Sequence, residues 1–108
     1  MYKSIQPQNA HDMIEKDAVT IIDIRDSASF DQGHLEHAQH VTGENVEEFV
    51  EAADLTQPVL VYCYHGNASQ SAAEYFGNRG FHDVYHLVGG FEGWHSSNLP
   101  TTKSTNEH

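Results

Sequence analysis

Three runs of nearly continuous apolar and β-favouring residues constrain the fold of this chain more than any other feature. They occupy residues 19–24, 58–63 and 84–88, and a run without polar alternation is typical of a strand buried on both faces. Outside these runs, apolar residues recur at the spacing of amphipathic helices: Ala10, Met13 and Ile14; Val46, Phe49, Val50 and Ala53; and Ala68, Ala72, Tyr75 and Phe76. Strands that alternate with helices predict an α/β domain with a mostly parallel sheet and helices on both faces.

The extent of the domain follows from chain length and local composition. A chain of 108 residues is long enough for one hydrophobic core and too short for two. Short strands around Ile5 and at residues 38–41 bring the predicted sheet to four or five strands. Asn45 can cap the second helix, and Gly80 can end the third. We predict one domain over residues 1–99 and a solvated, disordered polar tail over residues 100–108.

Charge and cysteine content exclude several kinds of partner. The chain has 5 Lys and Arg against 16 Asp and Glu, a net charge of −11, which disfavours nucleic acid and anionic membranes. No stretch approaches the roughly 20 apolar residues of a membrane span and no signal segment is found, so we expect a cytoplasmic location. Cys63 is the single cysteine, so no internal disulfide can form. We expect no cofactor.

The histidines raise the question of a metal site. The chain has 9 of them, and His34, His37 and His40 follow one another at a spacing of three. No second cysteine or set of carboxylate ligands accompanies them, so we expect no metal.

Cys63 lies where a buried strand ends and a short turn leads into a helix, which is where open α/β sheets bind ligands. Gly66 adopts positive φ freely and Asn67 tolerates it, so successive backbone N–H groups can face the sulfur. These donors and the positive end of the following helix favour a thiolate nucleophile. A free cysteine is also commonly a small buried core residue, and position alone leaves both interpretations open.

The loop resembles the active-site loop of single-domain rhodaneses, in which cysteine opens a six-residue cradle with glycine at its fourth position. Residues 63–68 fit that pattern. Two further segments are similar to the family signatures and occur in the same order: residues 21–26 with Phe30, Gly33, His34 and Ala38, and residues 88–94. The resemblance therefore covers most of the predicted domain and implies a single rhodanese-like fold.

The resemblance also implies an activity, that of a thiosulfate sulfurtransferase. Cys63, as the catalytic residue, is expected to take the sulfane sulfur of thiosulfate as a persulfide, release sulfite, and pass the sulfur to cyanide or a thiol acceptor. By analogy with the family, a dithiol protein such as thioredoxin is a possible acceptor. The residues expected to form the persulfide-binding loop are Tyr64, His65, Gly66, Asn67, Ala68 and Ser69.

The loop departs from the family pattern at its end. Many relatives have Arg, Ser or Thr where this chain has Ala68, whose side chain cannot donate a hydrogen bond. Ser69 follows, and it can either hydrogen-bond to the sulfur or cap the helix. The loop contains no Lys or Arg, which leaves His65 as its candidate cation.

Residues of the two flanking signatures have structural explanations. We expect Asp23 and Arg25 to form a structural ion pair rather than to contact substrate, since such networks perturb charged residues as often as active sites do. Gly89, Gly90 and Trp94 are expected to shape a tight turn and a packed helix.

Four competing functions can be weighed against the sequence. A cysteine phosphatase needs an arginine six positions after the cysteine to clamp phosphate, and Ser69 occupies that position. A thioredoxin-like oxidoreductase needs a second cysteine in a Cys-x-x-Cys motif. The alternatives that stay open are a non-catalytic rhodanese-type protein-binding module and a persulfide carrier that uses another sulfur donor.

The net charge predicts how thiosulfate binding depends on salt. We expect weak binding that improves with added salt, because repulsion from exposed acidic groups beyond about 10 Å is screened at physiological ionic strength. The measurement is the KM for thiosulfate over a series of salt concentrations, and KM should fall as salt rises. A KM independent of salt would contradict this electrostatic explanation.

Overall fold

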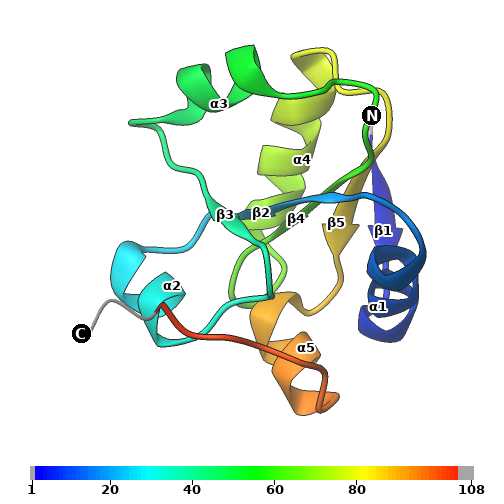
Figure 1. Cartoon of the computed structure of the whole chain (residues 1–108), viewed down its shortest axis with the longest axis vertical. Coiled ribbons are helices and arrows are strands. Elements are labelled where there is room, and N and C mark those ends of the chain that lie inside the picture. Colours follow the sequence, from blue (N-terminus) through cyan, green and yellow to red (C-terminus); the bar gives the residue numbers. More distant parts are fainter. Residues whose placement is uncertain (1, 105–108) are drawn as a thin grey trace.

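The computed structural model shows a sheet covered by helices on both faces (Figure 1), and it describes residues 2–104. The elements in chain order are β1 (Lys3–Ile5), α1 (Pro7–Lys16), β2 (Thr20–Asp23), α2 (Ser27–Gln32), β3 (Gln39–His40), α3 (Val46–Ala52), β4 (Val59–Tyr62), α4 (Ala68–Asn78), β5 (Val84–Leu87) and α5 (Gly90–Ser96). The five strands of this region are ordered β1-β5-β4-β2-β3, and every pairing between them is parallel. The predicted α/β fold is confirmed, with the larger of the two strand numbers.

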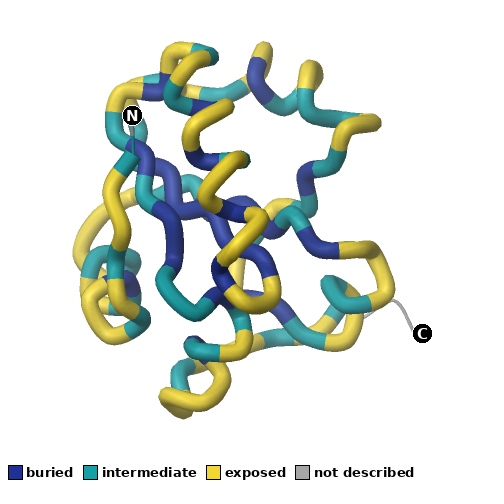
Figure 2. Tube along the Cα trace, turned by 180° about the vertical axis from the view of Figure 1, so that it is seen from behind, coloured by how far each residue is buried: buried dark blue, intermediate teal, exposed yellow. Residues whose placement is uncertain are grey.

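The central strand β4 shows why the apolar runs are continuous. Its side chains point alternately to the two faces of the sheet, and all four are buried. Val59 and Val61 join one core cluster with residues of α3 and α4, while Leu60 and Tyr62 join the other with residues of α1 and α5. Figure 2 shows buried residues along the central strands and exposed ones along much of the outer helices. Since both faces are covered, polar residues have no face of β4 to occupy.

The ends of two helices test the predicted caps. Gly80 follows α4 with φ +107°, a left-handed conformation that ends a helix, as predicted. Asn45 occupies the N-cap position of α3, but its side chain makes no cap hydrogen bond, so that prediction is wrong. Its Oδ1 accepts from the amide of Thr42 at 2.7 Å, and its Nδ2 donates to the carbonyl of His40 at 3.0 Å. The side chain therefore fastens the turn between β3 and α3.

Helix α2 has no counterpart among the predicted elements. It contains no buried residue, so it lacks the apolar stripe from which helices are predicted. It begins at a capping residue, Asp26, whose carboxylate accepts from the amide of Ser29 at 3.2 Å. Between residues 2 and 104, none of the helices has the length and apolar character needed to cross a membrane.

Part of the predicted polar tail, residues 100–108, is described. Thr102 pairs with His34 through two backbone hydrogen bonds of 2.9 and 2.8 Å. This pairing lays the segment along the loop that follows α2. The last four residues of the predicted tail, 105–108, lie outside the described residues, and the domain boundary after residue 99 stays a prediction.

Asp23 and Arg25 form the predicted ion pair at the end of β2. Arg25 donates from a guanidinium nitrogen to Asp23 at 2.7 Å, and its backbone amide donates to the same carboxylate at 2.8 Å. Asp23 is fully buried and Arg25 nearly so, and the guanidinium lies 4.2 Å from the centre of the Phe91 ring. Burial opposes the charge of Arg25, but the hydrogen bonds to Asp23 outweigh it and raise its pKa. The pair thus joins β2 to α5.

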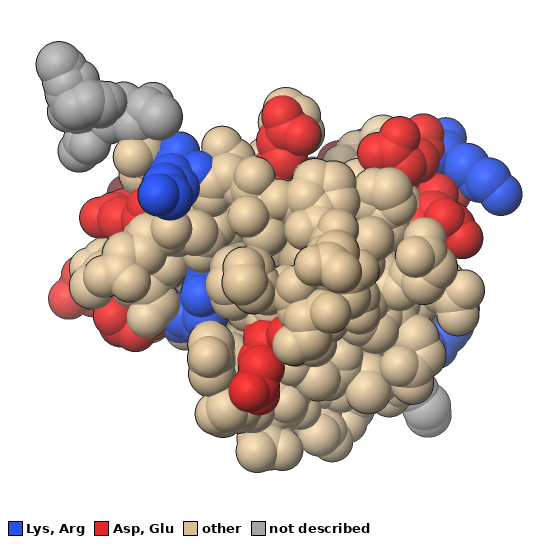
Figure 3. All heavy atoms as spheres, turned by 90° about the horizontal axis from the view of Figure 1, so that it is seen from below, with Lys and Arg blue, Asp and Glu red and all other residues tan. Residues whose placement is uncertain are grey.

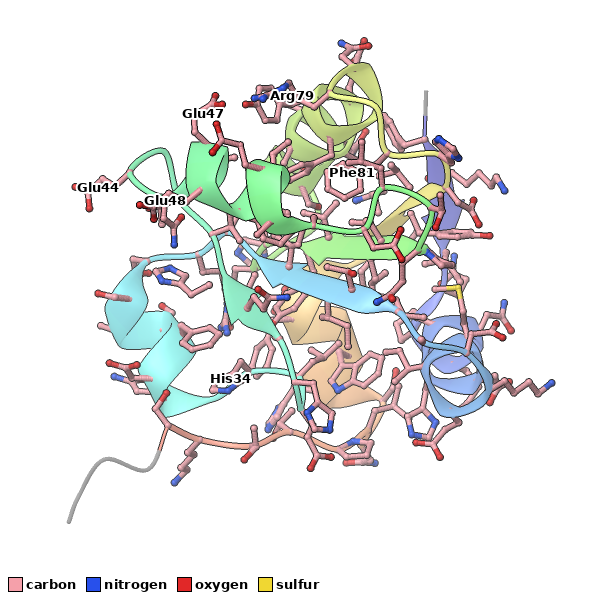
Figure 4. All side chains as sticks on the ribbon, turned by 45° about the horizontal axis from the view of Figure 1, so that its top comes forward. His34, Glu44, Glu47, Glu48, Arg79 and Phe81 are labelled. Atoms are coloured by element: carbon pink, nitrogen blue, oxygen red, sulfur yellow. The ribbon has the colours of Figure 1, made fainter. Side chains whose placement is uncertain are left out.

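Removal of one partner of this buried pair should destabilise the fold strongly. We expect Asp23→Ala to lower the free energy of unfolding by about 3–5 kcal/mol, because Arg25 is left buried without its counter-ion. The matched control is Glu47→Ala. Glu47 pairs with Arg79 at 2.9 Å on the exposed surface between α3 and α4 (Figure 4), where water screens the attraction. Urea unfolding of both variants gives the comparison, and equal effects would contradict this explanation.

Candidate active site

Cys63 directly follows β4, and the turn after it leads into α4. The side chain is nearly buried, with 7 % of its surface exposed. It lies at the carboxyl end of a central parallel strand, the edge at which such sheets bind ligands. The structure thus confirms the position that the sequence predicted for the sulfur.

Two backbone amides of the loop point at the sulfur. The Gly66 N–H donates to Cys63 Sγ at 3.1 Å, and the Ser69 N–H donates to it at 3.3 Å. Gly66 has φ +97°, and a Cβ on it would lie 2.9 Å from the amide nitrogen of Gly89. A side chain at this position is therefore excluded both by backbone conformation and by space.

Helix α5 fixes the direction in which these amides point. The amide of Phe91 donates to the carbonyl of Cys63 at 2.8 Å, and the amide of Glu92 donates to the carbonyl of Tyr64 at 3.0 Å. These loop carbonyls are bound on the side of the loop that faces α5. The amides of Gly66 and Ser69 are therefore free to point at the sulfur. Gly90 permits the close approach, because a Cβ on it would lie 2.5 Å from the carbonyl oxygen of Cys63.

These hydrogen bonds change the acidity of Cys63. Burial by itself raises the pKa of the thiol, because it penalises the charged form. The side chain and amide of Ser69 and the amides of Gly66 and Ala68 together outweigh burial, so that the pKa of Cys63 is lowered from its usual value. The loop therefore favours a thiolate, the form of cysteine that reacts as a nucleophile.

Ser69 contacts the sulfur rather than capping the helix. Its Oγ lies 3.4 Å from Cys63 Sγ, and it is fully buried in the first turn of α4. The same Oγ lies 2.8 Å from Nδ1 of His86, on the neighbouring strand β5. His86 is not among the site residues predicted from the sequence. A polar residue inside the apolar run 84–88 was the available signal, because a buried imidazole needs a hydrogen-bond partner.

The remaining loop residues lie at the mouth of the site. Tyr64 is 48 % exposed, and Nδ1 of the exposed His65 lies 2.7 Å from a carboxylate oxygen of Glu92. The candidate cation of the loop is therefore paired with an acidic residue. Asn67 occupies the N-cap position without a side-chain cap bond, and Ala68 begins α4. The structure brings all the predicted loop residues together around Cys63, but their roles in binding stay predictions.

A cavity of about 380 Å³ opens beside the loop rather than over the sulfur. Tyr64 and Phe91 line it together with Arg25, His95 and Lys103. Lys103 adds a positive side chain to its wall, whereas the charge of Arg25 is paired with Asp23.

Two of the three evenly spaced histidines share one aromatic partner, because the rings of His34 and His40 both stack on Phe30. The ring of His34 stacks on Phe30 with 3.8 Å between ring centroids, and Nε2 of His40 bonds to the carbonyl of Arg25. His37 sits in a turn with φ 70°. Within residues 2–104, the structure contains no group of three His, Cys, Asp or Glu side chains able to hold a metal ion.

The sheet, the loop and the cysteine together define a rhodanese-like domain. The family model described as "Rhodanese-like domain" matches residues 6–97, and the chain belongs to this family. It is similar to the thiosulfate sulfurtransferase GlpE of Pseudomonas fluorescens, with 50 % identity over 96 residues that cover 89 % of this chain and 87 % of the relative. It is also similar to GlpE of Vibrio cholerae, with 47 % identity over 95 residues that cover 88 % of this chain and 90 % of the relative.

The fold also resembles solved structures. The crystal structure of the Alr3790 protein from Anabaena sp. superposes with a TM-score of 0.84 at 24 % identity, covering 94 % of this chain and 83 % of that one. At this level of identity the similarity concerns the fold alone.

The packing of α5 against the loop generates a prediction about reactivity. We expect Gly90→Ala to slow alkylation of Cys63 by iodoacetamide at neutral pH by about tenfold or more, because the new methyl group displaces the carbonyls that orient the loop. The rate is measured by intact mass, which is unambiguous with a single cysteine.

Gly43→Ala is the matched control, because a Cβ there meets no atom within 4 Å. It should alkylate at the rate of the unmodified chain. A folded Gly90→Ala protein with an unchanged rate would show that α5 does not orient the amides.

Proposed function

We propose that this chain is a thiosulfate sulfurtransferase in which Cys63 carries the transferred sulfur as a persulfide. The observation that carries the proposal is the convergence of the Gly66 amide, the Ser69 amide and the Ser69 hydroxyl on one sulfur atom. Two relatives that are close to half identical over most of the chain bear the name thiosulfate sulfurtransferase, which supports the same activity here.

In the first step, the Cys63 thiolate attacks the sulfane sulfur of thiosulfate. A bond forms between the two sulfurs, and the bond between the two sulfur atoms of thiosulfate breaks. Its electron pair leaves with sulfite, and the outer sulfur of the persulfide keeps the negative charge that it carried in thiosulfate. The loop amides stabilise this charge as an oxyanion hole stabilises oxygen.

In the second step, cyanide or a thiolate attacks the outer sulfur. The persulfide bond breaks, its electron pair returns to Cys63 as the thiolate, and the acceptor leaves as thiocyanate or as a persulfide of its own. The donors that lower the pKa of Cys63 also make it a better leaving group here. Two half-reactions through one covalent intermediate predict ping-pong kinetics.

Peptide dipoles rather than cations hold the anionic sulfur in this proposal. The loop has no Lys or Arg, His65 is paired with Glu92, and Arg25 is held by Asp23. Figure 3 shows acidic side chains at several places on the visible face and fewer basic ones. Backbone amides fixed by the fold need no reorganisation when charge develops, so they can act in these surroundings.

The physiological acceptor is proposed to be a thiol of the cytoplasm, and a dithiol protein such as thioredoxin fits this chemistry by family analogy. The exposed ring of Tyr64, the residue after Cys63, offers a surface on which an acceptor can pack. The proposed reaction uses the thiol of Cys63 and needs no cofactor.

The direct test is intact mass after incubation with thiosulfate. We expect a gain of one sulfur atom, removed by cyanide with release of thiocyanate, and no gain in Cys63→Ser. A chain that takes up sulfur from a small persulfide but not from thiosulfate would instead be a persulfide carrier. A chain that takes up sulfur from neither would be a binding module, and the proposal would be wrong.

A further inference from the structure

His86 is a buried polar side chain in the middle of an apolar strand. It lies on β5 with 4 % of its surface exposed, and β5 pairs with β1 on one side and with β4 on the other. Residues 84 and 87 of the same strand belong to the two hydrophobic core clusters. An imidazole in such a place costs free energy unless it is hydrogen-bonded, so His86 needs a polar partner inside the fold.

That partner connects it to the reactive sulfur. His86 Nδ1 lies 2.8 Å from Ser69 Oγ, and Ser69 Oγ lies 3.4 Å from Cys63 Sγ. The three groups come from β5, the first turn of α4 and the end of β4, and they form one continuous chain of polar contacts. His86 does not touch the sulfur, so any effect that it has on Cys63 passes through Ser69.

The direction of the two hydrogen bonds follows from counting protons. The Ser69 hydroxyl has one proton and can donate it either to the sulfur or to His86. When Cys63 is a thiolate, the sulfur can only accept, so it competes with Nδ1 for that proton. If Nδ1 carries a proton of its own, it donates to Ser69 Oγ and leaves the hydroxyl proton for the sulfur.

The surroundings of His86 keep it neutral. Burial lowers its pKa, so one of its ring nitrogens carries a proton at neutral pH and the other does not. The titratable groups that face it among the described residues are Tyr2, whose ring lies edge-on with 5.9 Å between centroids, and, through Ser69, Cys63. Its partners across the sheet, Ser4 and Val61, do not titrate.

We propose that His86 is a positioning residue that donates from Nδ1 to Ser69 and thereby directs the Ser69 hydroxyl proton to the Cys63 sulfur. The sulfur then has a side-chain donor in addition to the Gly66 and Ser69 amides. This inference deepens the proposed function, on which its catalytic meaning rests, by naming a residue that stabilises the anionic states of the same sulfur. Ser69 takes over the donor role that Ala68 cannot fill.

The test compares the thiol pKa of Cys63 in variants, measured by the pH dependence of its alkylation. We expect His86→Leu to raise this pKa by about one unit, with an approximately tenfold slower alkylation at neutral pH, because Ser69 then lacks the donor that directs its hydroxyl proton to the charged sulfur. His86→Asn should restore most of the lost reactivity, because its amide nitrogen can occupy the place of Nδ1. His34→Leu is the matched control, a buried histidine elsewhere in the chain that should leave the thiol pKa unchanged.

A double-mutant cycle separates this role from a structural one. Ser69→Ala should raise the thiol pKa by a similar amount, and adding His86→Leu should raise it no further, because the second residue acts through the first. Additive effects would overturn the proposal, as would an unchanged thiol pKa in folded His86→Leu. No thiosulfate is used, so these results are independent of whether the chain transfers sulfur.

A measurement on the unmodified chain covers the case in which His86→Leu does not fold. Long-range nitrogen–proton NMR correlations identify which ring nitrogen of His86 carries the proton. We expect the Nδ1–H tautomer at a pH where Cys63 is ionised. An Nε2–H tautomer under those conditions would overturn the proposal, because Nδ1 would then take the Ser69 proton away from the sulfur.

Discussion

The hydrogen bonds from the amides of Phe91 and Glu92 to the carbonyls of Cys63 and Tyr64 determine the orientation of the whole loop. They bind the loop carbonyls on the side of α5, and the amides of Gly66 and Ser69 reach the sulfur on the other. The glycines follow from this arrangement, since a methyl group on either Gly66 or Gly90 would collide with backbone atoms. The lowered pKa of Cys63 comes from the amides oriented in this way together with the side chain of Ser69.

This arrangement explains how a strongly acidic chain can stabilise a negative sulfur. The nearby arginine, Arg25, is held by Asp23, so its charge supports the junction of β2 and α5. The negative charge on the Cys63 sulfur is stabilised by fixed peptide dipoles and one hydroxyl, which act over hydrogen-bond distances. Distant acidic side chains are screened by salt, whereas these short contacts are not. The Asp23–Arg25 pair therefore stabilises the fold, and the loop amides with the Ser69 hydroxyl stabilise the sulfur.

The sheet and the position of Cys63 could be predicted from the sequence. One helix and the side-chain contacts of the site could not, for physical reasons. The runs around β2, β4 and β5 predicted the sheet because both faces of each strand are buried. Cys63 could be placed at a strand end because the apolar run stops there. The short helix α2 could not be predicted, because it buries nothing. The contact of Ser69 with His86 joins residues 17 positions apart, and only the packing of α4 against β5 brings them together.

The most direct test of this account is the titration of Cys63 in the unmodified chain, followed by ultraviolet absorbance of the thiolate. With one cysteine, the signal that a Cys63→Ser variant lacks belongs to this sulfur. The account predicts a midpoint below the value of about 8.5 for a free cysteine, because the loop donors outweigh burial. A midpoint at or above that value would show that burial dominates, and would contradict the claim that the loop stabilises an anionic sulfur.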